Sequence, residues 1–305
     1  MADGRRCTPP ERERKVTQQA EVCCIGQAVS VHFLHVEHYP LRGSSVPIRS
    51  VLSIAGNDAY IVASMLAKRG VVTTLWSNPV ARQLVAHGRA LKLSSKLLLA
   101  HLSDEANAPP NYCIYEIDGT RTWLPTHVEI QNPLDIHNLE GYRYIYADYY
   151  DELVNTMTPV LHNRQDLCPR VLLNLSTTDI SQKLRALSGL ESIFAVQLSI
   201  GPDVAKAEKI AAQIAEHLKP TLVICTLAEL GSLIRRGSTQ MHVPAPKVVN
   251  RQNGAGAVFS AAFLHALLKQ MDVYAAHALA VEHATEFCSN ELNPLDLQKF
   301  MNGQS

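Results

Sequence analysis

A glycine turn in the last fifth of the chain constrains the fold most strongly. Residues 248–253 end a predicted strand, Gly254 and Gly256 let the backbone turn tightly, and an apolar helix is predicted to follow. Backbone N–H groups that converge in such a turn, together with the positive end of the helix, suit a phosphate or an oxyanion. No Asp or Glu occurs from position 250 to 258, so the turn itself carries no general base.

Composition narrows the class of protein. The 305 residues are 47% hydrophobic and 18% charged, which is enough for one large α/β domain or two small ones. The formal net charge of zero argues against nucleic acid as a partner. No apolar run is long enough to cross a membrane and no signal segment is visible, so we expect a cytoplasmic protein. The 7 scattered cysteines are expected to be reduced thiols.

The order of the predicted elements indicates the architecture. Residues 1–20 are charged and polar and are expected to form a disordered tail. Beyond them, short apolar runs typical of buried strands alternate with helical patterns, which predicts a doubly wound, mostly parallel sheet. The strand runs lie at 22–26, 71–76, 144–146, 171–174 and 222–227. The first main helix is expected to be capped by the side chain of Asn57 or Asp58, and the others are expected to span 81–91, 205–218 and 274–288. An Asp-Gly turn predicts a β-hairpin at 112–123.

Several motifs resemble the ribokinase/PfkB family of small-molecule kinases. The family signature Asp-Thr-x-Gly-Ala-Gly-Asp-x-Phe is matched by Gly254-Ala255-Gly256 and Phe259. The stretch at 55–59 resembles the family's Gly-Gly-Asn-x-Ala substrate motif. The stretch at 226–231 resembles its Thr-x-Gly-x-x-Gly nucleotide loop, with Ala228 in place of one glycine. Ketohexokinase-like members look closest, because the stretches at 203–206 and 228–231 are similar to theirs.

This resemblance implies a fold and a set of site residues. The expected fold is α/β and ribokinase-like, a doubly wound, mostly parallel sheet over residues 21–305, with a small β-sheet lid from about 28–53 and 110–125. The resemblance assigns nucleotide contacts to Thr226, Gly231, Asn253, Gly254, Ala255 and Gly256, and substrate contacts to Gly56, Asn57 and Arg251. It also implies ATP with Mg as cofactors, a sugar, sugar phosphate or nucleotide as ligand, and a homodimer formed through the lid strands.

The sequence departs from the family at positions that carry chemistry. Ala257 replaces the catalytic Asp, and Arg251 replaces the leading Asp of the signature. The family's first substrate-binding Asp falls at Val31, or at Ser30 if the alignment slips by one, and the second Asn of the sugar motif falls at Tyr60. The Asn-x-x-Glu motif that helps organise magnesium is absent from 197–203. We therefore predict no catalytic residue and no metal ligand, and a pseudokinase or strongly impaired sugar kinase.

Two alternatives stay open. The first is an active kinase whose base comes from elsewhere, either from Asp203 or from the polar stretch at 148–152. The polar composition of 148–152 predicts an exposed loop. The second is an interaction subunit that binds no ligand. No Ser–His–Asp or paired-carboxylate arrangement stands out, and His32, His35 and His38 do not share one face of an extended chain, which argues against a metal site there.

Overall fold

The structure of the protein is a computed structural model. It describes residues 20–77, 97–100, 110–117, 121–124, 139–190, 193–246 and 253–289. Nearly all of the expected tail, the helix expected at 81–91 and Arg251 lie outside these residues. Within the described part of the chain, no helix combines the length and the apolar character that a membrane span requires.

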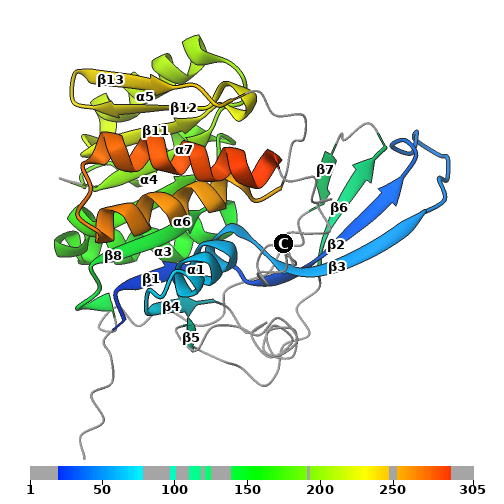
Figure 1. Cartoon of the computed structure of the whole chain (residues 1–305), viewed down its shortest axis with the longest axis horizontal. Coiled ribbons are helices and arrows are strands. Elements are labelled where there is room, and N and C mark those ends of the chain that lie inside the picture. The colour runs from blue at the N-terminus through cyan, green and yellow to red at the C-terminus, as the bar shows by residue number, and fades with distance from the viewer. Residues whose placement is uncertain are drawn as a thin grey trace, which may run out of the picture.

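A nine-stranded sheet forms the centre of the molecule (Figure 1). The strands from β11 to β5 run parallel to one another, and β12 and β13 add an antiparallel edge. Their order is β13 (Thr239–Val243), β12 (Ser232–Arg236), β11 (Leu222–Thr226), β10 (Ala195–Ser199), β9 (Val171–Leu175), β8 (Tyr144–Tyr149), β1 (Val22–Ile25), β4 (Thr73–Trp76) and β5 (Leu97–Ala100). The continuous apolar runs predicted this arrangement, because a strand that is covered on both faces has apolar side chains at successive positions and does not alternate apolar with polar residues.

Helices cover both faces of this sheet (Figure 1). One face carries α1 (Asp58–Lys68), α6 (Ala255–Leu268) and α7 (Val273–Ser289). The other carries α3 (Asp151–Asn163), α4 (Ile180–Ala186) and α5 (Val204–Leu218). Two 3₁₀ turns, η2 (Gln165–Arg170) and η3 (Ala228–Leu230), lead into strands. The two separate cores confirm the doubly wound architecture.

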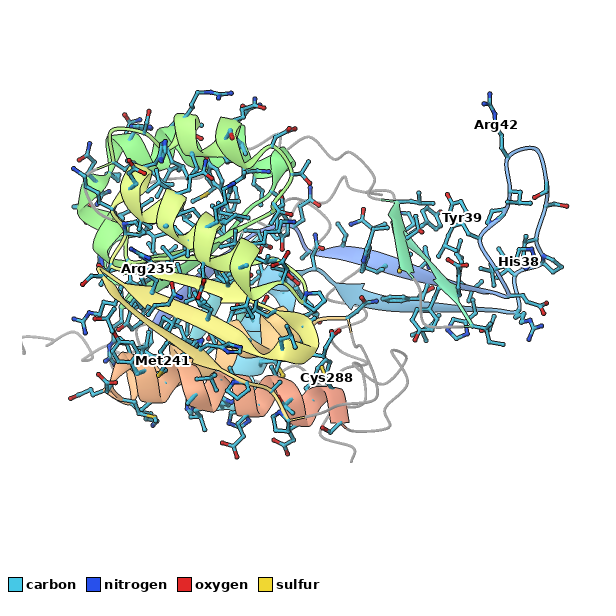
Figure 2. All side chains as sticks on the ribbon, turned by 90° about the horizontal axis from the view of Figure 1, so that it is seen from above. His38, Tyr39, Arg42, Arg235, Met241 and Cys288 are labelled. Atoms are coloured by element: carbon cyan, nitrogen blue, oxygen red, sulfur yellow. The ribbon has the colours of Figure 1, made fainter. Side chains whose placement is uncertain are left out.

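A second, four-stranded sheet projects from the main body (Figure 1). Its order is β3 (Ser50–Gly56), β2 (Val29–Val36), β6 (Asn111–Glu116) and β7 (Arg121–Leu124). The predicted hairpin is confirmed, since β6 and β7 pair antiparallel from Tyr112↔Leu124 to Tyr115↔Arg121. His38, Tyr39 and Arg42 lie at the far end of this sheet (Figure 2).

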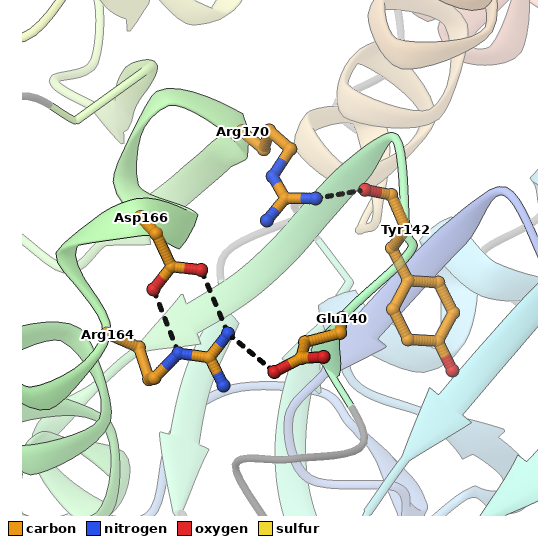
Figure 3. Close-up of polar contacts among 5 residues, drawn as sticks. All are labelled: Glu140, Tyr142, Arg164, Asp166 and Arg170. Carbon is orange, nitrogen blue, oxygen red and sulfur yellow. Dashed lines mark hydrogen bonds and ion pairs between the residues drawn. The ribbon is translucent and has the colours of Figure 1, made fainter.

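A surface ion-pair group joins the start of β8 to the start of β9 (Figure 3). The Arg164 guanidinium binds the Asp166 carboxylate through two nitrogens, at 2.8 and 2.9 Å, and lies 3.2 Å from Glu140. This pairing lowers the pKa of Asp166. Arg170 donates to the carbonyl oxygen of Tyr142. The Asp166 side chain is 56% exposed, so the pair contributes little to stability.

The end of β1 meets β8 and α1 at a position where only glycine fits. A Cβ on Gly26 would lie 2.6 Å from the Ala59 Cβ, and nearer still to Oδ2 of Asp148. Both neighbours are fully buried, so neither can move aside without disturbing the core.

We expect Gly26→Ala to lower the free energy of unfolding by about 1–3 kcal/mol, the usual cost of overpacking a core. Urea denaturation monitored by circular dichroism measures it. Gly256→Ala is the control, because nothing lies within 4 Å of its added Cβ and alanine favours a helix. Equal stability of Gly26→Ala and the natural sequence would contradict the close contact.

Candidate functional site

A cavity of about 810 Å³ lies where the carboxyl ends of the parallel strands meet the small sheet. Its lining includes one residue at or just beyond the end of each of five parallel strands, namely Gln27, Tyr150, Ser176, Ser199 and Thr226. The small sheet contributes Val31, Phe33 and Trp123. Open α/β sheets bind their ligands at this edge, so the cavity is the candidate functional site.

The cavity brings together the residues that the sequence motifs selected. Its lining contains Gly56, Asn57, Thr226, Gly231, Asn253, Gly254, Ala255 and Gly256. These residues come from positions that are up to 200 apart in the chain, which makes their convergence a finding of the structure. Arg251, the remaining residue that the motifs selected, lies outside the described residues.

The glycine turn forms the N-terminus of α6. Gly254 has φ +92°, a left-handed conformation that glycine adopts without strain. The first N–H groups of a helix have no partner within the helix, so Ala255 and Gly256 can direct theirs at a ligand. Gln197 braces the turn, since its Nε2 donates to the Gly256 carbonyl at 3.3 Å and its Oε1 lies 2.9 Å from Ser260 Oγ.

Ala257 follows the turn, at the place of the aspartate in the resembled signature. Its side chain is 1% exposed and belongs to the core between the sheet and the helices α1, α6 and α7. A methyl group there can neither accept a proton nor bind a hydroxyl. Val31, at the place of the expected substrate-binding Asp, lines the cavity with an apolar side chain.

The loop after β11 keeps the backbone shape of a glycine-rich turn. Gly231 has φ +90°, and a Cβ there would collide with the backbone of the segment after β13. Ala228, which replaces a family glycine, has φ +52°. The left-handed conformation costs an alanine about 1–2 kcal/mol, so this loop retains its shape at some cost in stability. Leu227 N–H closes it by donating to the Gly231 carbonyl at 2.8 Å.

Two carboxyl groups lie together at the N-terminus of α1, and one of them, Asp58, lines the cavity. Asp148 of β8 is 0% exposed and accepts hydrogen bonds from Tyr146 Oη at 2.9 Å and from the Ala59 N–H at 3.1 Å. Asp58, the first residue of α1, lines the cavity and accepts from the Tyr150 hydroxyl. Asn174 Nδ2 joins them, lying 3.1 Å from an oxygen of Asp58 and 3.2 Å from one of Asp148.

Burial dominates the ionisation of this pair. Burial, and after it the charge of Asp58, raise the pKa of Asp148 to about 8, although hydrogen bonds from Tyr146, Asn174 and the Ala59 N–H act in the opposite direction. Burial also raises the pKa of Asp58. Two carboxylates that share one hydrogen-bond donor repel each other when both are ionised, so near neutral pH the pair holds about one proton.

Several expectations about these residues were wrong. The stretch at 148–152 is not an exposed loop, because Asp148 and Tyr149 are buried residues of β8 and α3 starts at Asp151. The paired carboxylates were missed, since positions 58 and 148 are far apart in the chain. The one available signal was an acid within the tyrosine-rich apolar run 144–150.

Two individual residues also differ from expectation. Asn57 precedes α1 but its side chain caps nothing, because φ is +86° and its Nδ2 lies instead 3.5 Å from Gln27 Oε1. Asp203, considered as a relocated base, caps α5 by accepting from the Lys206 N–H at 2.9 Å and does not line the cavity.

The described residues contain no group of three His, Cys, Asp or Glu side chains that could hold a metal ion. Magnesium binds proteins mainly through one or two carboxylates together with substrate phosphates. Asp58 and Glu229 are the acids that line the described part of the cavity, so magnesium would have to enter with a phosphorylated ligand.

The raised pKa of Asp148 predicts the direction of a pH effect on stability. The folded protein binds a proton that the unfolded chain releases near pH 4, so the free energy of unfolding falls as pH rises from about 4 to about 8. Burial lowers the pKa of His277 to about 4, which has the opposite effect but only below about pH 6.5. Denaturation midpoints at pH 6.5 and 8.5 exclude His277. Burial lowers the pKa of Lys68 to about 8, so Lys68 titrates in this window in both proteins, and the difference between the natural sequence and Asp148→Asn measures the aspartate. We expect the decline in the natural sequence and a smaller one in Asp148→Asn. Equal declines would contradict the assignment.

Comparison with known proteins supports the architecture. Residues 152–292 match the family model described as pfkB family carbohydrate kinase. Comparison with curated proteins finds no match. Similar solved structures include ribokinase from Thermotoga maritima, with 15% identity, 94% of this chain and 99% of that chain covered, and a TM-score of 0.66. Phosphofructokinase-2 from Escherichia coli in complex with fructose-6-phosphate has 14% identity, coverage of 93% and 99%, and a TM-score of 0.69.

Arabidopsis thaliana ribokinase complexed with ribose and ATP is also similar, with 15% identity, coverage of 94% and 99%, and a TM-score of 0.68. At such identities the likeness concerns the fold. The mostly parallel main sheet and the separate small sheet agree with it. The chain therefore has the ribokinase-like α/β fold, and its residues 152–292 match the pfkB family of carbohydrate kinases.

Proposed function

We propose that the protein binds a small sugar, sugar phosphate or nucleotide in the cavity and is a pseudokinase or a strongly impaired kinase. One observation carries this proposal. The anion-binding turn Gly254-Ala255-Gly256 lines the cavity, whereas the next residue, Ala257, contributes a buried methyl group where the resembled kinases have their base. The site therefore keeps the means of binding a phosphate and lacks the usual means of activating a hydroxyl.

The expected loss of rate is large. A positioned general base contributes about 10²–10⁴-fold to a typical reaction. Positioning and electrostatic stabilisation carry much of phosphoryl transfer, so slow turnover is compatible with this proposal. ATP with magnesium is the proposed nucleotide, supported by similar proteins whose structures hold ATP or ADP. Within this class, the ketohexokinase-like branch is proposed on the sequence stretches at 203–206 and 228–231 alone.

An active kinase is the second candidate, and one observation favours it. Asp58 lines the cavity and could accept a proton from a bound hydroxyl, a role that Asp203 cannot fill from outside the cavity. Turnover by the natural sequence that disappears in Asp58→Asn would support this candidate over the pseudokinase.

A binding measurement distinguishes the proposed function from the alternative of an interaction subunit that binds no small-molecule ligand. We expect ATP–magnesium, ADP, D-ribose or D-ribose 5-phosphate to raise the melting temperature. A ligand at a hundred times its dissociation constant adds about 2.7 kcal/mol to the free energy of unfolding. Thermal-shift titration measures this, and no shift with any of these compounds would contradict ligand binding.

We expect Ala257→Asp alone not to restore phosphoryl transfer, because Val31 and Tyr60 also replace polar residues of the resembled site. A coupled ADP-release assay with ATP, magnesium and a panel of sugars measures turnover for both proteins. The natural sequence is the control and should show little activity. Rapid turnover by the natural sequence would overturn the pseudokinase proposal, and full rescue by Ala257→Asp would show that the base is the only part missing.

We further infer a homodimer that forms through the small sheet, in the cytoplasm. The sheet exposes large apolar side chains, with Val51 56%, Trp123 45% and Leu124 42% exposed. The buried thiols of Cys23, Cys24 and Cys225 suit a reducing compartment. Val51→Glu should shift a dimer to a monomer in sedimentation velocity, whereas Val51→Thr should not. A monomeric natural protein would contradict the dimer.

A further inference from the structure

A groove between α5 and the hairpin of β12 and β13 lies apart from the candidate site. It shares no lining residue with the cavity. Val223 and Arg235, which are opposed on β11 and β12, line the groove, whereas the pair Thr226↔Ser232 of the same strands lines the cavity. The two pairs are three residues apart along each strand, or about 10 Å. Figure 2 shows Arg235 at the end of the main body that is remote from the small sheet.

Small and apolar residues form the hollow. Ala212 and Ala215 line it from α5, and Gly237 of the hairpin turn adds no side chain. Val223 is 1% exposed and belongs to the core on the α5 side of the sheet, so the floor of the groove is apolar. Walls of this kind suit the carbon atoms of a small ligand, whose orientation is then fixed by a few polar groups.

One cation in the groove is left without a partner by the fold. Arg235 points to the same face of the sheet as Val223, because directly opposed residues of an antiparallel pair share a face. Its Nε is buried and finds no acceptor within the described chain, where the guanidinium makes no ion pair either. The two outer nitrogens are not enclosed in this way. A buried N–H without an acceptor costs stability, and an anion on the outer nitrogens would neutralise the unpaired charge.

A second cation and a hydroxyl group line the same groove. Lys219 follows α5 with φ +47°, and in the part of the chain that the structure describes its ammonium group makes no hydrogen bond or ion pair. The hydroxyl of Ser238, in the turn between β12 and β13, likewise has no partner among the described residues. Glu216 is the one acid that lines the groove, and within the described chain it pairs with neither cation. The two cations exceed Glu216 and the partial negative charge of about one half at the end of α5 taken together.

The number of donors decides which anion suits the groove. A guanidinium binds two oxygens at once through its planar fork, and the ammonium and hydroxyl groups can each bind a further oxygen. A carboxylate has only two oxygens. A phosphate monoester has three terminal oxygens and carries a charge of about −1.5 to −2 at pH 7, so it satisfies more of these donors and is attracted more strongly.

We propose that the groove binds the phosphate group of a small phosphate monoester, with Arg235, Lys219 and Ser238 as its donors. The apolar walls would contact the carbon atoms of the ester. Binding here is independent of the ligand proposed for the cavity, because the two sites share no residue.

Amide NMR of the nitrogen-15-labelled protein tests this site, with Gly237 as the reporter and glycerol 3-phosphate and inorganic phosphate as the probes. We expect both probes to shift the Gly237 resonance saturably, the ester binding at least as tightly because it also contacts the walls. In Arg235→Gln both should bind about 10-fold to 100-fold more weakly, because hydrogen bonds to a charged group are lost. Arg236→Gln is the matched control. It removes the same charge from the next residue, which does not line the groove, and should change either affinity by less than about 2-fold at 0.15 M salt.

Equal affinities in Arg235→Gln and Arg236→Gln would overturn the site, as would a Gly237 shift that grows with phosphate and never saturates. Sodium acetate that binds as tightly as phosphate would overturn the assignment to phosphate. Inorganic phosphate that binds while glycerol 3-phosphate does not would overturn the monoester as ligand.

A second variant keeps the test decisive if Arg235→Gln does not fold. Lys219→Gln keeps a long side chain at the same backbone position and should weaken both probes by about 3-fold to 10-fold. Unchanged binding in Lys219→Gln would overturn the three-donor site. The Gly256 amide, in the turn that lines the cavity, reports separately on ligands there, so failure of the groove site is distinguishable from failure of the proposed function.

Discussion

One buried hydrogen bond holds the two walls of the cavity together. Asp148 Oδ2, on the interior strand β8, accepts from the Ala59 N–H at the start of α1. This bond satisfies one of the N–H groups that every helix leaves unpaired in its first turn, and the absence of a side chain at Gly26 gives the carboxyl group its space. Because α1 follows β3 directly, the same bond fixes where the small sheet leaves the main body.

The parts of the fold that depend on local requirements could be predicted from the sequence. A strand buried on both faces needs a continuous apolar run, and the runs at 22–26 and 222–227 are such strands in the structure. A tight turn needs a residue that tolerates positive φ, which identified Gly254, whereas Gly231 was identified by the resemblance of 226–231 to a nucleotide loop and also has positive φ. The cavity residues were recognised from the same turns, since backbone shape and backbone N–H groups make that part of the site.

The carboxyl pair could not be predicted in this way. Asp58 and Asp148 belong to different elements, and only the packing of α1 against β8 brings both to Asn174. Polar residues such as those at 148–152 usually mark loops, because burying a carboxyl group without partners is costly. Here two tyrosine hydroxyls, one amide and one backbone N–H supply the partners, and these contacts exist only in the folded chain.

The shape of the anion-binding turn is independent of the residue that would make it a catalyst. Gly254 provides the left-handed residue, and Gln197 and Ser260 brace the Gly256 carbonyl. None of these contacts involves the side chain of Ala257, whose methyl group packs in the core. An alanine at position 257 is therefore compatible with the folded turn, whose residues still line the cavity. Negative charge at the other end comes from Asp58, held by Asn174 and Tyr150, so the cavity has one end that attracts anions and one that repels them. A ligand that spans the cavity would therefore meet backbone N–H groups at one end and the carboxyl group of Asp58 at the other.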